Sequence, residues 1–399
     1  MKNRFLWVVG FVFMVITLSA CGGGGGGDSA STPTPTPTPT MANIMAVAAG
    51  SNQTVALKND GTVWTWGDNS YGQLGVGSNN PPSRNSPAQV GGLTGIIAIA
   101  SGGSFSVALK NDGTIWTWGD NSYGQMGDGT TTYRYTPIQV IGVTGITAIA
   151  VGAHYTVALK NDGTVWAWGS NDSGQLGDGT TISRYTPVHV IGLTGVTEVA
   201  AGWNNTIALK NDGTVLAWGN NSYGQLGDGT KISKYTPIPV SGFIGITAVV
   251  AGTWHMVALK SDGTVWALGR NNSGQLGDGT TIDRYTPIQV QANIYPPGGL
   301  TSIMGIATGL DYTITLKNDG TVWTWGDNSY GQLGIGTGSA FRTLPDQVTS
   351  LTSITAIAAG WDNTVALKND GTVWAWGLNN SGQLGDGTTS DRYVPVQVK

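Results

Sequence analysis

Residues 156–180 read TVALKNDGTVWAWGSNDSGQLGDGT, and variants of this phrase occur seven times along the chain. The Asp-Gly pair of the phrase falls at Asp60, Asp112, Asp162, Asp212, Asp262, Asp319 and Asp370. The steps between these positions are 50 to 57 residues. A period of this length, filled with short apolar runs and turn signals, is typical of propellers and solenoids. The sequence therefore indicates an array of similar units.

Each repeat contains four short runs with the composition of β-strands. In the third copy these runs are residues 146–152, 156–160, 164–168 and 187–190, the last of which begins with Pro187. The sequence Asn161-Asp162-Gly163 joins the second run to the third, and these residues tolerate the positive φ angles of tight hairpins. Four antiparallel strands repeated seven times predict an all-β fold, the seven-bladed β-propeller. The 57-residue step predicts an extra loop near Ala292–Leu300, where two prolines and two glycines stand together.

The first 43 residues differ from the repeats. Lys2 and Arg4 precede a short apolar run that ends in Leu18-Ser19-Ala20-Cys21, the pattern of an export signal. Residues 22–40 are rich in Gly and then in Thr-Pro, a composition that forms extended tethers. We therefore expect a signal peptide over residues 1–20, a tether over residues 21–43 and the propeller over residues 44–399.

The ending Leu-Ser-Ala-Cys resembles bacterial lipoprotein signals. This resemblance implies lipidation of Cys21, the only cysteine of the chain, and an exported protein anchored in the cell envelope. Gly22 in place of an Asp favours the outer membrane. The alternative is a plain signal peptide followed by an incidental Cys. The membrane is expected as a partner only through the lipid anchor.

Composition argues against several function classes. Without residues 1–20 the chain has 17 Lys and Arg against 23 Asp and Glu, a net charge of −6, so nucleic-acid binding has no electrostatic support. Glu198 is the only Glu, and no GxSxG or phosphate-loop motif occurs, so we predict no enzyme and no cofactor. The repeated GDGT aspartates are explained by turn chemistry, and we predict no metal site. Whether His154, His189 and His255 converge in space is left open.

The phrases AxGxxxTxAL, DGxVW and WGxNxxGQLG together resemble the repeat of the regulator-of-chromosome-condensation family. The Gly-Gln-Leu-Gly signature occurs six times, and Gly124-Gln125-Met126-Gly127 is a seventh variant. The resemblance covers the chain after the tether and implies the same propeller. The eukaryotic role in nucleotide exchange on a small nuclear GTPase conflicts with an exported, acidic chain. Secreted bacterial propellers of this kind that bind other proteins share the AAGxxxxxAL and WG phrases and resemble this chain more.

The seven copies differ most in the three residues that follow the Gly at the end of the first strand. These turns read SNQ (51–53), GSF (103–105), AHY (153–155), WNN (203–205), TWH (253–255), LDY (310–312) and WDN (361–363). Six of the 21 positions are aromatic, and three of these are tryptophans outside the VWxWG phrase. The residue after the Gly of VWxWG also varies. The strand directions place both variable sets on one end of the propeller, here called the top face.

We therefore predict that the top face binds a partner, because aromatic side chains give large contact areas at low entropic cost. The candidate contact residues are Phe105, Tyr155, Trp203, Trp254, His255, Arg270, Asp311, Tyr312, Trp361 and Asp362. A protein partner is favoured, and a glycan or cell-wall polymer is the alternative. If these side chains are contacts, they should be substantially exposed. In a different interpretation, the turn aromatics cap the central channel or pack between blades.

Overall fold

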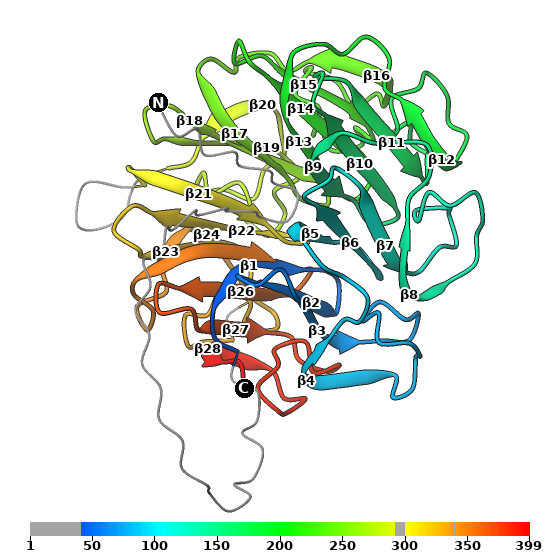
Figure 1. Ribbon diagram of the computed structural model, residues 1–399. Helices are drawn as coiled ribbons and strands as arrows, with labels where there is room; N and C mark the ends of the chain where they lie inside the picture. Colours follow the sequence, from blue (N-terminus) through cyan, green and yellow to red (C-terminus); the bar gives the residue numbers. More distant parts are fainter. Residues whose placement is uncertain (1–40, 292–299, 339) are drawn as a thin grey trace, which may run out of the picture.

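The computed structural model describes residues 41–291, 300–338 and 340–399 as seven β-sheets arranged in a ring (Figure 1). Each sheet has four strands in chain order, and neighbouring strands are antiparallel. The predicted seven-bladed propeller is therefore confirmed. In this part of the chain every regular element is a strand, and no helix has the length and hydropathy of a membrane span. The loop expected near Ala292–Leu300 lies outside the described residues, apart from Leu300.

The blades, numbered 1 to 7 in chain order, have similar strand lengths and spacings. Blades 1 to 4 comprise β1 (Ile44–Ala49), β2 (Gln53–Lys58), β3 (Val63–Asp68), β4 (Ser83–Gln89), β5 (Ile96–Ser101), β6 (Phe105–Lys110), β7 (Ile115–Gly119), β8 (Arg134–Gln139), β9 (Ile146–Val151), β10 (Tyr155–Lys160), β11 (Val165–Gly169), β12 (Arg184–His189), β13 (Val196–Ala201), β14 (Asn205–Lys210), β15 (Val215–Gly219) and β16 (Lys234–Pro239). Blades 5 to 7 comprise β17 (Ile246–Ala251), β18 (His255–Lys260), β19 (Val265–Gly269), β20 (Arg284–Gln289), β21 (Ile303–Thr308), β22 (Tyr312–Lys317), β23 (Val322–Asp327), β24 (Phe341–Gln347), β25 (Ile354–Ala359), β26 (Asn363–Lys368), β27 (Val373–Gly377) and β28 (Arg392–Gln397).

The fourth strand of each blade begins earlier than predicted. In blade 3 it begins at Arg184, and Pro187 stands inside β12 instead of at its start. A proline is tolerated there because β12 is the outer edge of its sheet and pairs with β11 alone. A register shift between Ala167 and Gly169 accompanies this pairing.

Side chains of the repeated phrase join each blade to the one before it. The indole of Trp168 donates a hydrogen bond to the carbonyl of Gln125 in the preceding blade, at 2.9 Å, and the Thr156 hydroxyl donates to the same carbonyl at 3.1 Å. Equivalent indole bonds occur at five further junctions. Blade 5 differs, since Leu268 and Met256 replace the Trp and the Thr. The constant Trp and Gln of the repeat are thus explained by packing between blades.

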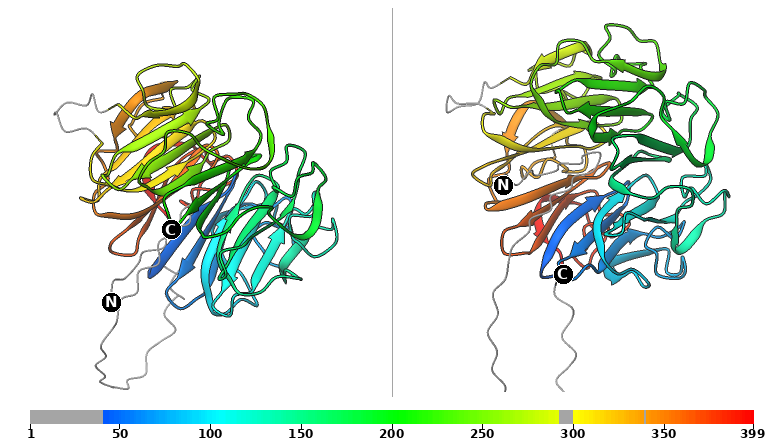
Figure 2. Two further views of the ribbon diagram at one scale, coloured as in Figure 1. Left: turned by 90° about the horizontal axis from the view of Figure 1, so that it is seen from above. Right: turned by 45° about the horizontal axis from the view of Figure 1, so that its top comes forward.

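The ring closes without exchange of a strand. Blade 1 is built from β1–β4 alone and blade 7 from β25–β28 alone, and the two sheets lie side by side in Figures 1 and 2. Across this closure the Trp66 indole and the Thr54 hydroxyl both donate to the Gln383 carbonyl, at 2.9 and 2.8 Å. The closing junction therefore repeats the bonds of most internal junctions.

Glu198 is an exception in an otherwise apolar innermost strand. It lies on β13 where the other six blades have Ala or Gly, and it is buried. Its carboxyl accepts one hydrogen bond, from the Val249 amide of the next blade, at 3.2 Å. Burial raises the pKa of Glu198 well above its ordinary value, and that bond opposes the rise only in part. The folded protein therefore favours the protonated form of this carboxyl.

We expect Glu198→Ala to raise the free energy of unfolding near pH 8 by roughly 1–3 kcal/mol, the range for a poorly satisfied buried polar group. Because the folded-state pKa is raised, the contribution of Glu198 is fully favourable below its unfolded pKa and is lost as the pH rises through the folded pKa. The stability gain should therefore shrink at about pH 4. Thermal unfolding of both proteins across this range measures the effect. A constant difference at all pH values would contradict it.

Candidate functional site

Four of the ten predicted contact residues are fully buried, so their expected exposure was wrong. These residues are Phe105, Tyr155, His255 and Tyr312. Each stands third in its turn, but the turn itself occupies only two residues, so the third residue already begins the second strand, as Tyr155 begins β10. The side chain is then directed between blades instead of outward.

These buried side chains bind the neighbouring blade. The Tyr155 hydroxyl donates to the carbonyl of Asn205 in blade 4 at 2.6 Å. The Tyr312 hydroxyl donates to the equivalent carbonyl of Asn363 in blade 7, also at 2.6 Å. His255 lies 3.2 Å from the Thr313 hydroxyl through Nε2, and burial, aided by Arg270, lowers its pKa to about 3. For these four residues the interpretation as packing between blades is correct, and they contribute no exposed surface to a partner.

Most side chains at the first and second turn positions are not fully buried between blades as those at the third position are. Three tryptophans at these positions lie close together. Trp203, Trp254 and Trp361, here called the tryptophan cluster, are half-buried. The rings of Trp203 and Trp361 stack with their centroids 4.8 Å apart, and Trp254 lies 6.5 Å from Trp203 on a nearly parallel plane. Side chains from blades 4, 5 and 7 therefore form one aromatic surface on the top face.

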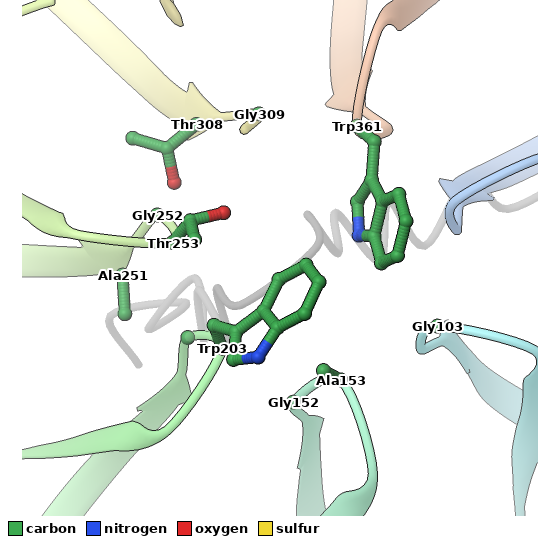
Figure 3. Close-up of a pocket in the computed structure, with 11 residues that line it drawn as sticks. Gly103, Gly152, Ala153, Trp203, Ala251, Gly252, Thr253, Thr308, Gly309 and Trp361 are labelled. Atoms are coloured by element: carbon green, nitrogen blue, oxygen red, sulfur yellow. The ribbon is translucent and has the colours of Figure 1, made fainter. Parts of the chain in front are cut away.

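The tryptophan cluster lies over the central channel. Figure 3 shows Trp203 and Trp361 pointing toward one another across the mouth of the channel, which is lined by backbone-rich turns with residues such as Gly152, Gly252 and Gly309. The cavity that they line has a volume of ≈ 20 Å³, enough for about one water molecule. A larger ligand does not fit inside this cavity.

Other aromatic residues extend the cluster and were missed from the sequence. His154 lies 4.9 Å from the Tyr123 ring and 6.5 Å from Trp203. Tyr223 lies 5.4 Å from Trp254, and the Arg270 guanidinium lies over the Tyr223 ring at 5.3 Å. A signal for the tyrosines existed in the repeats, because the position before GQLG is Tyr in four copies and Ser in three.

The glutamine of GQLG places the variable residues of adjacent blades next to each other. The Gln275 amide donates to Asp311 of the next blade at 2.8 Å, and Asp311 also forms a 3.2 Å salt bridge with Arg270. The Gln332 amide donates to Asp327 of its own blade at 2.5 Å and to Asp362 of the next at 3.4 Å. Both variable sets therefore share the top face, as predicted.

Asp362 has an unusual electrostatic environment. Burial, together with the nearby carboxylates of Asp327 and Asp311, raises its pKa to about 7. Burial also raises the pKa of Asp311, but Arg270 opposes that rise. One side of the tryptophan cluster is therefore bordered by carboxylates that repel one another.

The remaining polar repeats have structural roles. The Asp178 carboxylate of the GDGT connector accepts hydrogen bonds from Thr180 and from Arg184 of the same blade, which agrees with turn chemistry. His189 packs edge-on against Trp166 on an outer strand, far from the buried environment of His255. In the described ranges no three His, Cys, Asp or Glu side chains group as metal ligands would. The predicted signal, most of the tether and Cys21 fall outside those ranges.

Comparison with known families agrees with the architecture. A profile of the RCC1-like domain matches residues 17–246 and, in a second overlapping match, residues 144–399. The fold, the repeat phrases and this match together define the class of protein. The chain belongs to the RCC1-like domain family.

Several characterised proteins share part of the chain. It is 48% identical over 90 residues to the human E3 ubiquitin-protein ligase HERC2, which is 22% of this chain and 2% of HERC2. It is 38% identical over 96 residues to the ultraviolet-B receptor UVR8 of Arabidopsis thaliana and 31% identical over 97 residues to the human regulator of chromosome condensation, in each case 24% of this chain. These matches span 22% and 23% of the two relatives, so they transfer no activity.

Two solved structures show the same fold. Human WBSCR16 superposes with a TM-score of 0.75 at 23% identity, over 85% of this chain and 94% of its own. Prp20p of Saccharomyces cerevisiae superposes with a TM-score of 0.70 at 22% identity, over 82% of this chain and 84% of its own. At such identities the likeness concerns the fold alone.

Proposed function

We propose that this chain is a binding protein of the cell envelope and that it docks a protein partner on the tryptophan cluster of its top face. The observation that carries the proposal is the cluster itself, since three half-buried tryptophans from three blades stack on one another, and two of them line a small cavity. Soluble proteins rarely leave such aromatic surface unused. The structure of Prp20p is described with its binding to Gsp1p and histones, so a propeller of this fold can serve protein recognition.

The stacking geometry favours a protein over a glycan. Sugars bind tryptophan through a free ring face, but in Trp203 one face is covered by Trp361 and the nearly parallel Trp254 lies 6.5 Å away. The small cavity also offers no cleft for a polymer chain. Enzymatic function has no support from the residues that surround the mouth, which are mostly Gly, Ala, Thr and Trp.

The proposal includes export of the protein and its anchoring in the cell envelope, and this part rests on the sequence of residues 1–21. We expect Cys21→Ala to leave the chain unlipidated and to shift it from the membrane fraction to the soluble fraction. Cell fractionation with mass spectrometry of the mature N-terminus measures this. A Ser19→Thr variant, which keeps the cysteine, serves as the control. Native chain that retains residues 1–20 in the cytosol would contradict the proposed export.

Capture of envelope proteins on the immobilised chain tests the proposed function when it is compared with capture on Trp203→Ala. The relevant partner is one that binds the parent chain and is lost from the variant. A variant at Lys160 on the opposite end of blade 3 is the control, because this residue belongs to the constant LKNDG hairpin.

A further inference from the structure

At two junctions between blades the top face pairs an acidic residue with a basic or titratable one. The pair consists of the residue after VWxWG of one blade and the second turn residue of the next blade. At the junction of blades 2 and 3 these residues are Asp120 and His154, 3.7 Å apart, and at the junction of blades 5 and 6 they are Arg270 and Asp311. An acidic residue thus faces a basic or titratable one at both junctions.

The junction of blades 6 and 7 differs from those two because both of its residues are acidic. Here the two residues are Asp327 and Asp362, and both carboxylates approach the single amide of Gln332. Asp327 is further bonded by the Ser329 hydroxyl at 2.8 Å, but the long bond from Gln332 is the sole hydrogen bond of the Asp362 carboxylate within the described residues. Neither carboxylate forms a salt bridge with another residue of that part of the chain. Two carboxylates thus share one amide donor at this junction.

The uncompensated junction adjoins the tryptophan cluster. Trp361 directly precedes Asp362, and its carbonyl accepts a 3.0 Å hydrogen bond from the Leu310 amide, which holds the turns of blades 6 and 7 together. A partner side chain that contacts Trp361 would therefore lie one residue along the chain from this pair of carboxylates. Cations are attracted both by the face of a tryptophan ring and by carboxylates.

We propose that the partner docked on the tryptophan cluster presents an arginine or lysine side chain, whose cationic head binds between Asp327 and Asp362 beside Trp361. This inference rests on the proposed function and specifies the chemistry of the partner. The aliphatic stem of either side chain would cover aromatic surface while the head remains with the carboxylates.

Charge complementarity makes the binding dependent on pH. A cationic head favours ionised Asp362, and the pKa of this carboxyl in the free protein is about 7. At pH 6 about a tenth of the molecules carry the ionised form, and at pH 8 about nine tenths do. The affinity for a cationic side chain should therefore rise by about tenfold between these two values.

The test is a titration of the full chain with the capped tripeptide acetyl-Gly-Arg-Gly-amide, followed through the indole NMR signals of Trp203 and Trp361. We expect saturable shifts, with a dissociation constant about tenfold lower at pH 8 than at pH 6. Asp362→Asn should weaken binding and abolish the pH dependence. Asp370→Asn, which removes a carboxylate from the exposed hairpin at the opposite end of the same blade, should change neither.

Equal binding of acetyl-Gly-Gln-Gly-amide, or equal affinity at both pH values, would overturn the inference. Stabilisation by calcium that Asp362→Asn removes, without binding of the arginine peptide, would also overturn it, because the carboxylates would then serve a metal. Partner capture that survives Asp362→Asn but not Trp203→Ala would reject the cationic contact and keep the docking site. Loss of neither would reject the proposed function itself.

Discussion

Replacing Trp66 with alanine is expected to lower the free energy of unfolding by about 3–5 kcal/mol, the range for truncation of a buried aromatic side chain. Trp66 is fully buried at the junction that closes the ring, and its indole supplies one of the two side-chain hydrogen bonds to the Gln383 carbonyl. No strand is shared across this junction, so side-chain packing holds the first and last blades together with a few hydrogen bonds between turns and connectors, such as that from the Gly387 amide to the Asn85 carbonyl at 2.9 Å. Urea denaturation measures the loss, and limited proteolysis detects opening of the ring.

Two matched variants test whether the loss comes from the buried indole of Trp66 itself. Trp64→Ala removes the half-buried tryptophan of the same strand and should have the smaller effect. Trp66→Leu reproduces the side chain that blade 5 carries naturally at Leu268, so it should lie between the parent and Trp66→Ala. If Trp64→Ala were the more damaging of the two alanine variants, the closure would not depend on the buried indole.

Replacing Trp203 with alanine is expected to weaken partner binding by about 2 kcal/mol or more, which is roughly a 30-fold rise in the dissociation constant. Trp203 lies at the centre of the tryptophan cluster, between Trp361 and Trp254, so its loss removes a contact and also loosens both neighbours. Because the ring is half-exposed, the free energy of unfolding should fall by about 1 kcal/mol or less. Isothermal titration and thermal unfolding of the same samples measure the two effects.

The neighbouring tryptophans give a graded series. Trp361→Ala should weaken binding nearly as much, and Trp254→Ala less, since Trp254 lies farther from the central ring. Asn161→Ala in the opposite hairpin should leave binding unchanged. A loss of about 3 kcal/mol in stability with intact binding would instead assign the cluster to packing of the channel mouth.

The sequence predicted the architecture well because every blade repeats the same local signals. The hairpin at Asn161-Asp162-Gly163, the apolar runs beside it and the period were enough for seven four-stranded blades. The sequence placed the start of the fourth strand of blade 3 at Pro187, three residues after its actual start at Arg184. Its run is partly polar and exposed, and Pro187 suggested a strand start although an edge strand tolerates it inside.

The candidate site was predicted only in part, since variation among repeats has two physical causes. Trp203 and Trp361 vary and lie at the surface, whereas Tyr155 and His255 vary and are buried. The buried ones differ because each fits the particular neighbour that it touches in the next blade. One sequence does not distinguish these causes unless it is known where the turn ends and the second strand begins. A shift of one residue in that boundary decides whether a side chain is buried or lies at the surface.

Gln332 of the sixth GQLG connector acts on its surroundings through two different groups. Its backbone carbonyl accepts the Trp376 and Thr364 bonds that join blades 6 and 7, while its side-chain amide donates to the variable residues Asp327 and Asp362. The backbone of this residue thus serves the packing of the blades, and its side chain serves the surface that binds the partner. The two variable residues at a junction can therefore be substituted, in evolution or by design, without loss of the hydrogen bonds that join the blades.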